Sequence, residues 1–418
     1  MIATIRRARK LEGAIRVPGD KSISHRSLML AAIATGRSRI SGLSTGADVR
    51  STAACLGRLG AELDDAGMTG RGLRGLHQAA GPLYCGNSGT TMRLLAGLLA
   101  GQEFESELTG DESLTRRPMG RVVEPLREMG ARASWPPLRV GGETSLRGID
   151  YLMPLASAQV KSAILLAGLY AGEPTTITEP VRTRDHTERM LIAMGATVEV
   201  DGLRVRVEPA TALSPLDVEI PGDVSAGAFW LVAGGLVAGS RVALEGIGVN
   251  PTRTSFIDLL RRCGFSISVS NQRTAAGEAV ANLHAHGAAD PRAMQVTGAM
   301  AAEIIDELPV LAVAATQLPG RSVIAGAAEL RVKESDRIAA MEEGLAAMGA
   351  DISATDDGWV INGPRALEGA RVSAHGDHRV AMALAVAGLV ADGKTEIEGA
   401  EFVEISYPRF FDHLEYLC

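Results

Sequence analysis

The chain has 418 residues, of which 46% are hydrophobic and 22% are charged. This length exceeds what one ordinary core needs, so we expect two domains of about 200 residues each. The formal net charge of -7 and an aromatic content of only 4% argue against a nucleic-acid-binding protein, which would carry a basic surface and stacking rings.

Neither terminus nor any internal stretch predicts membrane association. The first ten residues are basic but lack the apolar run of a signal peptide. The longest apolar stretch, residues 226–239, is rich in glycine and too short to span a bilayer. The cysteines form no C-x-x-C pair, which indicates buried, reduced thiols rather than a zinc or redox site; they are Cys55, Cys85, Cys263 and Cys418. We therefore predict a cytoplasmic protein without a metal site.

An apolar helix rich in small residues recurs along the chain, each time after a loop with polar or charged residues. We predict the copies at residues 24–32, 90–100, 160–171, 226–238, 307–315 and 379–391. A short β-like run follows each copy, and in most copies a second helix then ends at Gly-Ala. These stops are at Gly60, Gly130, Gly195 and Gly349, with Gly264-Phe265 as a variant. Glycine is expected just past a helix end because it adopts the left-handed conformation without strain.

The spacing of these stops indicates the fold class. They recur roughly every 65 to 85 residues, a longer period than the roughly 20–50 residues of a solenoid. Alternating strand patterns, as in residues 197–200 and 203–207, follow the stops. We predict an α/β fold of six βαβαββ-type repeats, three in each of two domains. An α/β protein without repeats also alternates strands and helices, but here the stops and the strand pairs recur together.

The domain boundary is predicted at the sequence Ile-Pro-Gly-Asp, residues 220–223. One domain then comprises residues 15–220, and the second comprises residues 1–14 plus 221–418.

Polar motifs precede the apolar helices, beginning with residues 17–26. Lys21 and Arg26 flank the first helix N-terminus, whose free N–H groups attract anions. A P-loop would place a glycine before the lysine, and none is present. The alternative is an ordinary surface Lys/Arg pair. Residues 85–93 bring small side chains to the next helix, which suits either a helix cap or a ligand close to the backbone.

Three further motifs carry cations or neutral hydrogen-bonding groups. Arg116 and Arg117 precede a helix predicted at residues 120–128, where an arginine could bind a carboxylate or phosphate, or else be a solvated charge. Ser157 and Gln159 begin another helix. Arg184 fits a surface or a site, and Arg189 is expected on a wet helix face.

The C-terminal motifs combine acids and bases. Asp306 fits either a helix N-cap or a carboxylate that bonds a substrate hydroxyl. Glu334 beside Lys333 and Arg337 suits a proton donor next to an anion site, although a charged run is usually a solvated face. Residues 377–379, Asp-His-Arg, lead into the last apolar helix. If the helix heads converge, these cations form a site for two small anions.

Taken together, these motifs resemble those of EPSP synthases, a family of enolpyruvyl transferases. The matching motifs lie at residues 19–26, 86–90, 117–120, 157–159, 331–337 and 377–379. The resemblance runs from about Leu11 to the C-terminus. It implies a two-domain inside-out α/β barrel, with the N-terminal strand in the second domain.

The resemblance also implies the reaction. The enolpyruvyl group of phosphoenolpyruvate passes to the 5-hydroxyl of shikimate 3-phosphate, which gives 5-enolpyruvylshikimate 3-phosphate and phosphate in aromatic amino acid biosynthesis. It implies no cofactor and a monomer that acts on small molecules and binds neither nucleic acid nor membrane. Glyphosate is an expected inhibitor at the phosphoenolpyruvate position.

The family's site residues carry over by position. The resemblance implies shikimate 3-phosphate contacts from Lys21, Ser22, Arg26, Ser157, Ala158, Gln159, Arg184, Asp306 and Lys333. It implies phosphoenolpyruvate contacts from Lys21, Gly89, Arg117, Gln159, Arg337 and Arg379. It implies proton transfer by Lys21, Asp306 and Glu334, with no assignment of steps.

Some features separate this chain from other members or leave alternatives. Glu329 and Ile405 stand where an asparagine and a lysine are frequent in the family. The nearest alternative is UDP-N-acetylglucosamine enolpyruvyl transferase, whose typical cysteine is missing from residues 111–117. A non-catalytic ligand-binding relative is the other alternative.

Overall fold

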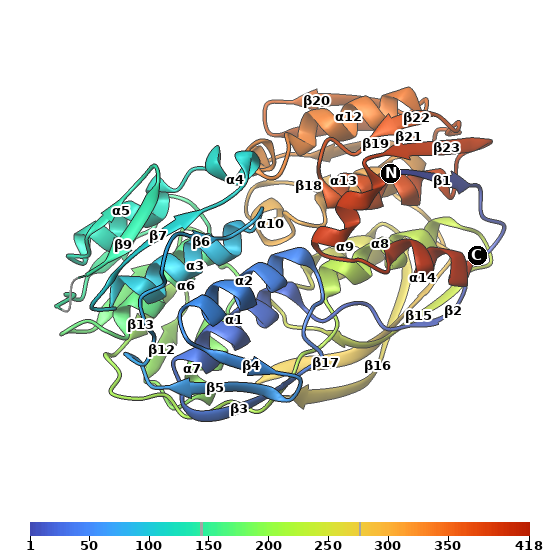
Figure 1. The fold of residues 1–418 in the computed structure, drawn as a ribbon. Helices are drawn as coiled ribbons and strands as arrows, with labels where there is room; N and C mark the ends of the chain where they lie inside the picture. The colour runs from blue at the N-terminus through green and yellow to red at the C-terminus, as the bar shows by residue number, and fades with distance from the viewer. Residues whose placement is uncertain (143–144, 276) are drawn as a thin grey trace. The chain divides into compact units, whose positions relative to one another are not determined.

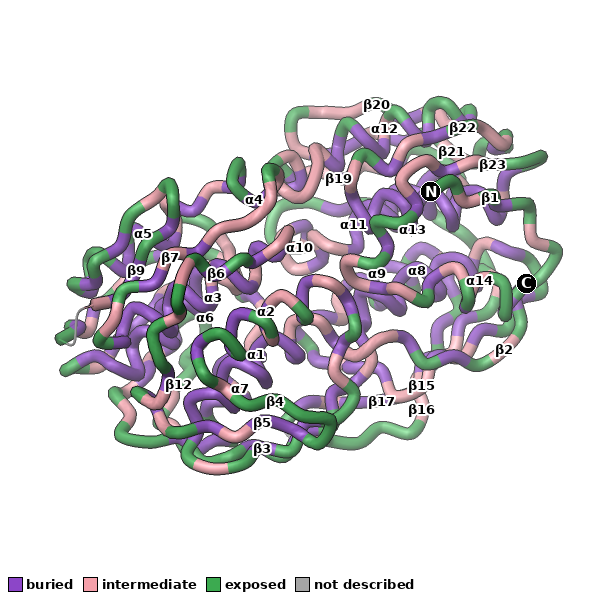
Figure 2. The backbone as a smooth tube through the Cα atoms, viewed as in Figure 1, coloured by how far each residue is buried: buried purple, intermediate pink, exposed green. Residues whose placement is uncertain are grey.

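The computed structural model describes residues 1–142, 145–275 and 277–418 as a mixed α/β protein (Figure 1). Its buried apolar residues form two clusters, each inside its own part of the chain (Figure 2). The α/β fold class predicted from the sequence is confirmed.

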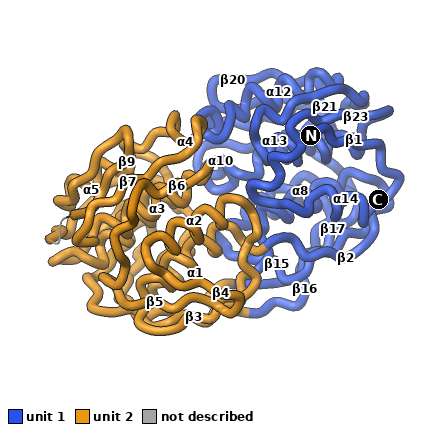
Figure 3. The backbone as a smooth tube through the Cα atoms, in the orientation of Figure 1, with its two compact units in different colours: residues 1–18, 221–273, 279–418 blue, residues 19–220, 274–278 orange. Residues whose placement is uncertain are grey.

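The chain divides into two compact units (Figure 3). Unit 1 comprises Met1–Pro18, Pro221–Arg273 and Ala279–Cys418, and unit 2 comprises Gly19–Ile220 and Thr274–Glu278. The chain leaves unit 2 after Ile220, but residues 15–18 lie in unit 1 and residues 274–278 lie in unit 2, unlike in the predicted domains. The Asp223 amide donates to the Pro18 carbonyl at 2.9 Å, which joins residue 18 to unit 1. The Glu278 carboxylate lies 2.7 Å from His186 Nδ1, which joins that segment to unit 2.

The described residues of unit 2 form three four-stranded sheets. The first has the order β14-β3-β5-β4 and consists of β3 (Thr35–Ser41), β4 (Glu62–Asp64), β5 (Gly67–Arg71) and β14 (Val218–Glu219). The second has the order β6-β7-β9-β8 and consists of β6 (Leu83–Tyr84), β7 (Glu105–Thr109), β8 (Ala133–Ser134) and β9 (Leu138–Gly141). The third has the order β10-β11-β13-β12 and consists of β10 (Asp150–Leu152), β11 (Thr175–Thr178), β12 (Val198–Asp201) and β13 (Arg204–Val207).

In the part of the chain that the structure describes, unit 1 also has three sheets. The first has the order β16-β17-β15-β2 and consists of β2 (Glu12–Ile15), β15 (Arg241–Gly248), β16 (Ser266–Ala275) and β17 (Glu278–His286). The second has the order β18-β19-β21-β20 and consists of β18 (Gln295–Val296), β19 (Gly320–Ile324), β20 (Asp351–Thr355) and β21 (Gly358–Gly363). The third has the order β1-β23-β22 and consists of β1 (Ile2–Arg6), β22 (Arg371–Ser373) and β23 (Lys394–Glu398).

Every sheet joins one parallel strand pair to an antiparallel neighbour. Strands β6 and β7 are parallel, for example, and β9 pairs antiparallel with β7. In unit 1, β1 pairs antiparallel with β23, with Ile2 opposite Glu398, so the N-terminal strand completes a sheet at the other end of the chain. This placement agrees with what the resemblance implied.

Each sheet has an inner helix, and these helices are the predicted apolar ones. They are α1 (Lys21–Ala32), α3 (Gly89–Ala100) and α6 (Ala158–Gly168) in unit 2, and α8 (Val224–Leu236), α11 (Leu308–Gln317) and α13 (His378–Gly388) in unit 1. Within unit 1 the three pack against one another, and within unit 2 α3 packs against both others. They are buried on almost every side, so they must be apolar all round (Figure 2).

The remaining helices are outer ones or short turns. The outer helices are α2 (Ala47–Arg58), α5 (Gly120–Glu128), α7 (His186–Ala193), α9 (Ser255–Arg262), α12 (Arg337–Ala347) and α14 (Phe410–Leu417). The short ones are α4 (Glu112–Thr115), α10 (Gly298–Glu303), η1 (Ala328–Val332) and η2 (Ala400–Ile405). The order β6-α3-β7-α5-β8-β9, interrupted only by α4, is the predicted βαβαββ repeat.

The predicted glycine stops end five of the outer helices. All have positive φ, from 86° to 93°, at Gly60, Gly130, Gly195, Gly264 and Gly349. This left-handed conformation closes the last helical turn and starts the next strand. The stops were therefore correctly read from the sequence.

Two other predictions meet different outcomes. Cys55, Cys85 and Cys263 are buried, but Cys418, just beyond α14, is exposed, so its predicted burial is wrong. Among the described residues, no helix is both long enough and apolar enough to cross a membrane.

Candidate functional site

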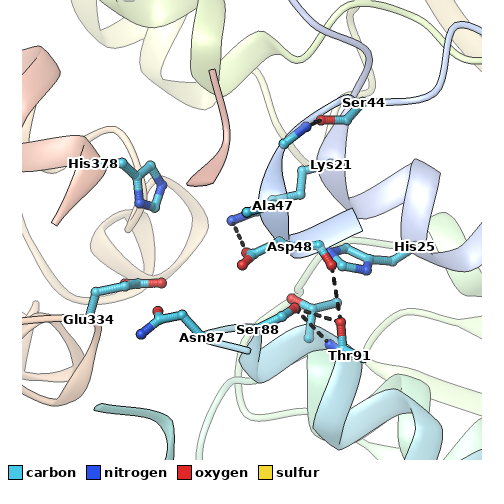
Figure 4. A network of polar contacts seen from close by, with 12 residues as sticks. Lys21, His25, Ser44, Ala47, Asp48, Asn87, Ser88, Thr91, Glu334 and His378 are labelled. Carbon is cyan, nitrogen blue, oxygen red and sulfur yellow. Dashed lines mark hydrogen bonds and ion pairs between the residues drawn. The ribbon is translucent and has the colours of Figure 1, made fainter. Parts of the chain in front are cut away.

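The first predicted motif forms the head of α1. Asp20 caps this helix by accepting a hydrogen bond from the Ile23 amide at 2.9 Å. A side chain at residue 19 would meet the Gly42 carbonyl oxygen at 1.9 Å, so only glycine fits this close backbone approach. Lys21 Nζ donates to Asp48 Oδ2 at 3.0 Å, and both side chains are largely buried (Figure 4). A surface Lys/Arg pair is therefore excluded.

A chain of buried polar groups connects α1 to the head of α3 (Figure 4). His25 Nδ1 lies 2.6 Å from Thr52 Oγ1, which lies 2.7 Å from Thr91 Oγ1. Thr91 Oγ1 in turn lies 2.7 Å from Ser88 Oγ, and Ser88 caps α3. Burial, followed by the charges of Lys21 and Arg26, holds the pKa of His25 well below its ordinary value. His25 is thus a neutral member of this chain.

Arg26 is almost completely buried and has hydroxyl partners on two other helices. Its Nε donates to Thr187 Oγ1 at 2.7 Å, and its Nη2 donates to Ser162 Oγ at 2.7 Å. Arg184 Nη1 donates to Ser22 Oγ at 3.3 Å. Two arginines predicted to bind phosphate thus lie around one helix head.

The head of α3 brings together another group of predicted residues. Gln159 Nε2 donates to Thr90 Oγ1 at 2.9 Å, and Arg93 donates to Gln159 Oε1. A Cβ atom at Gly89 would lie 3.1 Å from Arg93 Nη1 and 3.2 Å from Arg117 Nη1. Gly89 therefore leaves both guanidinium groups room beside the helix N-terminus.

The two arginines of the third motif have different roles. Arg116 is exposed and pairs with Glu112, as the solvated-charge alternative requires. Arg117 is only 7% exposed, and its Nη2 donates to Asn87 Oδ1 at 2.6 Å. Helix α5 begins at Gly120 and ends at Glu128, as predicted. Arg117 is the member of this pair that remains a site candidate.

In unit 1, Arg337 holds three carboxylates around one guanidinium. Its Nε donates to Asp377 Oδ2 at 2.7 Å and its Nη2 donates to Glu334 Oε2 at 2.6 Å. Its Nη1 lies 3.5 Å from Asp306 Oδ1. Burial alone would lower the pKa of Arg337, but the three carboxylates raise it, so the guanidinium stays charged. The charged run of residues 331–337 is therefore not simply a solvated face.

Asp306 does not cap a helix, so the first of its two alternatives, an N-cap, is excluded. Helix α11 starts at Leu308 with Glu307 in the cap position, and Pro309 lacks the N–H that a side-chain cap would satisfy. The Asp306 carboxylate instead lies 3.5 Å from Arg379 Nε, and Arg379 Nη1 donates to the Asp306 carbonyl at 3.0 Å. This arrangement matches the alternative of a functional carboxylate.

Lys333 lies in the same cluster. Burial lowers the pKa of its ammonium group, the charge of Asp306 opposes this shift, and Arg337 adds to it. The unusual Glu329, on η1, and Ile405, at the end of η2, are both half-buried. Six predicted or neighbouring groups of unit 1 thus form a mixed acid–base cluster rather than a purely cationic one: Asp306, Lys333, Glu334, Arg337, Asp377 and Arg379.

The structure also adds residues that the motifs did not single out. Asp48 pairs with Lys21, Asn87 with Arg117, and Arg93 with Gln159. Asn87 and Arg93 lie inside the recognised motif of residues 85–93, whereas Asp48 is separated from Lys21 by a strand and had no local signal.

Arg189 is not the fully wet residue that was expected. It is half-buried, with its Nε 2.9 Å from Asp185 Oδ1 and its Nη1 donating to the Gly277 carbonyl at 3.0 Å. Its second partner comes from the segment between β16 and β17, which no helical pattern could reveal.

Ser157 caps α6 by accepting from the Val160 amide at 3.3 Å, and Ala158 is the first residue of that helix. Among the described residues, no group of three or more His, Cys, Asp or Glu side chains could hold a metal ion.

Comparisons with known proteins agree on one assignment. The sequence pattern of the EPSP synthase (3-phosphoshikimate 1-carboxyvinyltransferase) family matches residues 5–414. A 3-phosphoshikimate 1-carboxyvinyltransferase of Gloeobacter violaceus is 53% identical, covering 97% of this chain and 96% of that protein. Another from Herpetosiphon aurantiacus is 48% identical, covering 99% and 98%. A solved EPSP synthase structure from Acinetobacter baumannii is 40% identical with a TM-score of 0.86, covering 100% of this chain and 98% of that one.

The repeated α/β units with polar helix heads, together with this structural match, define an enzyme of the enolpyruvyl transferase class. Within that class, the chain belongs to the EPSP synthase family.

Proposed function

We propose that this chain transfers the enolpyruvyl group of phosphoenolpyruvate to the 5-hydroxyl of shikimate 3-phosphate, releasing phosphate. Membership of the family supports this reaction, and the single structural observation that carries it is the Arg337 cluster. There, one buried guanidinium holds Glu334 and Asp306, the two carboxylates proposed for proton transfer.

The chemistry requires both fixed charge and groups that exchange protons. The 5-hydroxyl adds to C2 of phosphoenolpyruvate while C3 gains a proton, and the tetrahedral product then loses phosphate and a proton. Positive groups stabilise the anionic carboxylate and phosphate, while acid–base residues move the protons. We assign proton transfer to Lys21, Glu334 and Asp306. Burial lowers the pKa of Lys333, as expected for a lysine whose ammonium group has lost much of its water.

The remaining assigned residues bind substrate. For shikimate 3-phosphate we propose contacts from Lys21, Ser22, Arg26, Ser157, Ala158, Gln159, Arg184, Asp306 and Lys333. For phosphoenolpyruvate we propose contacts from Lys21, Gly89, Arg117, Gln159, Arg337 and Arg379. Arginine suits these roles because its planar fork can donate two parallel hydrogen bonds to a carboxylate or phosphate.

The two alternatives make different predictions. A UDP-N-acetylglucosamine enolpyruvyl transferase typically has a cysteine in the segment that here comprises Asp111 to Arg117, which has none. A non-catalytic relative would have lost charged site residues, yet Lys21, Asp306 and Glu334 are all present.

A coupled phosphate-release assay tests the proposal. We expect release that requires both phosphoenolpyruvate and shikimate 3-phosphate and is absent when UDP-N-acetylglucosamine replaces the latter. Release with the nucleotide sugar alone as acceptor, or no release with either acceptor, contradicts the proposal.

We further propose that the enzyme acts as a cytoplasmic monomer on these small molecules, with no bound metal, organic cofactor, nucleic acid or membrane. Sedimentation velocity of the active enzyme should give a single species near the 43.7 kDa chain mass.

A further inference from the structure

We propose that a buried cluster of Lys161, Glu179 and Glu188 positions Arg26 and Arg184 for the phosphate of shikimate 3-phosphate. These three residues are positioning residues, since they act through the two arginines rather than on the substrate. The inference rests on the proposed role of Arg26 and Arg184 in binding that phosphate.

The cluster is one ammonium group between two carboxylates. Lys161 Nζ lies 2.9 Å from Glu179 Oε2 and 2.7 Å from Glu188 Oε1. The three side chains are only 1%, 2% and 3% exposed. Lys161 lies on α6, Glu179 follows β11, and Glu188 lies on α7, so the cluster fixes three elements of unit 2 to one another.

Two members of the cluster, Lys161 and Glu188, are adjacent in sequence to residues that contact Arg26. Ser162 follows Lys161 and accepts from Arg26 Nη2 at 2.7 Å. Thr187 precedes Glu188 and accepts from Arg26 Nε at 2.7 Å. Ser162 and Thr187 also lie 2.7 Å apart, Oγ to Oγ1. The distance between α6 and α7, which the ion pairs set, therefore determines whether both hydroxyl groups reach Arg26.

Arg184 is linked to the cluster through its neighbour. Thr183, which is buried, donates a hydrogen bond to the Glu179 carboxylate. This contact anchors the loop between β11 and α7 one residue before Arg184, whose Nη1 reaches Ser22 at the head of α1. Both arginines thus depend on the same buried carboxylate–ammonium arrangement.

Stability alone does not explain this cluster. Burying ions requires removing their water, and replacing a complete buried ion cluster with neutral residues of similar volume is often neutral or stabilising. One oxygen, Glu188 Oε2, has no hydrogen-bond partner among the described residues, which adds to the cost. A geometric role beside the arginines gives a reason for placing these charges in the interior of unit 2.

The test removes all three charges together. The variant Lys161→Met/Glu179→Gln/Glu188→Gln leaves no unpaired buried charge, so we expect it to fold. Loosened arginines should weaken substrate binding in the ground state and transition state alike, which raises KM without lowering kcat. We expect KM for shikimate 3-phosphate to rise roughly 10-fold to 100-fold, the range for a charge-assisted contact. KM for phosphoenolpyruvate and kcat should change less than about threefold.

Tyr170→Phe provides the matched control. Tyr170 lies just beyond α6, and its buried hydroxyl donates to the Leu73 carbonyl at 2.9 Å, away from the arginines. This variant should have a lower melting temperature but wild-type KM values. A triple variant that folds with wild-type KM for shikimate 3-phosphate overturns the proposal, as does one in which both KM values and kcat deteriorate together.

If the triple variant fails to fold, substitutions of Glu188 alone test the proposal. Glu188→Gln keeps the oxygen that accepts from Lys161 and should retain a near-normal KM, whereas Glu188→Ala should raise it. Equal KM values in folded Glu188→Ala and wild type overturn the proposal. Arg26→Ala and Arg184→Ala separate a failure of the proposed phosphate contacts from a failure of the positioning role. An unchanged KM for shikimate 3-phosphate in both variants contradicts the proposed phosphate contacts. A raised KM in these variants, with no effect of the cluster variants, contradicts only the positioning role.

Discussion

The helix heads of the two units hold their arginines by different chemistry. In unit 2, hydroxyl and amide groups contact the guanidinium groups, as Thr187 and Ser162 contact Arg26 and Asn87 contacts Arg117. In unit 1, carboxylates do so, as Asp377 and Glu334 contact Arg337. A hydroxyl orients a guanidinium without neutralising it, whereas a carboxylate also compensates its charge.

This difference suggests a division of labour on one repeated scaffold. The neutral contacts of unit 2 suit arginines that must attract an anion, and the ionic contacts of unit 1 suit carboxylates that must exchange protons in a defined place. Lys21 of unit 2 pairs with a carboxylate, that of Asp48, and it is also the residue of that unit assigned to proton transfer.

The largest effect is expected when a residue assigned to proton transfer is removed from either unit. Lys21→Ala and Glu334→Ala should each lower kcat by roughly 10²–10⁴-fold, the usual contribution of general acid–base catalysis. Steady-state kinetics measures the loss, and far-ultraviolet circular dichroism checks that the variants remain folded. Half of the wild-type rate in either variant contradicts its assigned role.

Stability should distinguish ionic from neutral contacts. Asp377→Asn leaves the helix cap but breaks a fully buried ion pair, which should cost about 3–5 kcal/mol in the free energy of unfolding. Thr187→Val removes a hydroxyl from Arg26 at similar burial and should cost about 1.5–3 kcal/mol. Urea unfolding compares the two variants. Equal losses would remove the distinction between the units.

Gly89→Ala tests the helix head in unit 2, where neutral groups contact the arginines, by adding a single methyl group. Glyphosate should compete with phosphoenolpyruvate in the wild type, and the variant should weaken the inhibitor by about 1–3 kcal/mol more than the substrate. The methyl group would force the guanidinium ends of Arg93 and Arg117 to shift by a few tenths of an ångström, so KM for phosphoenolpyruvate should rise modestly. A wild type that is already insensitive, with an unchanged variant, contradicts the steric account.

The smallest effect concerns pH and His25. The pKa of His25 in the folded chain lies below the ordinary value of 6.5. As the pH falls, the unfolded chain therefore binds a proton at His25 before the folded chain does. The contribution of neutral His25 to the free energy of unfolding is therefore fully present above about pH 6.5. Below that value this free energy falls, by up to about 1.4 kcal/mol per pH unit. His25→Asn should reduce this slope in denaturation between pH 7 and pH 5.

Much of the fold could be predicted from local sequence because short sequence patterns mark the boundaries of the elements in each repeat. The apolar helices, the glycine stops and helix α5 all follow from patterns within about ten residues. The polar residues at the helix heads were found for the same reason, since capping and anion binding both concentrate at an N-terminus.

The errors and omissions arise where partners are distant in sequence. Arg189 seemed solvated because Gly277 reaches it from a hairpin almost ninety residues away. The motifs did not single out Lys161 and Glu188, since nothing local in the sequence shows that they face each other across buried helices. Asp306 was ambiguous because an acid before an apolar helix fits a cap as well as a site, and only its approach to Arg379 distinguishes the two.

The pairing of β1 with β23 has a consequence for how the protein is made. Residues 2–6 are synthesised long before their partners at residues 394–398. Strand β2 likewise pairs with β15, which is synthesised much later. Nearly all of unit 2 is continuous in the chain, so it can fold during synthesis while the N-terminal segment stays unpaired. Unit 1 can close only after residues 394–398 have been synthesised, which makes its long-range strand pairing the step expected to be slow.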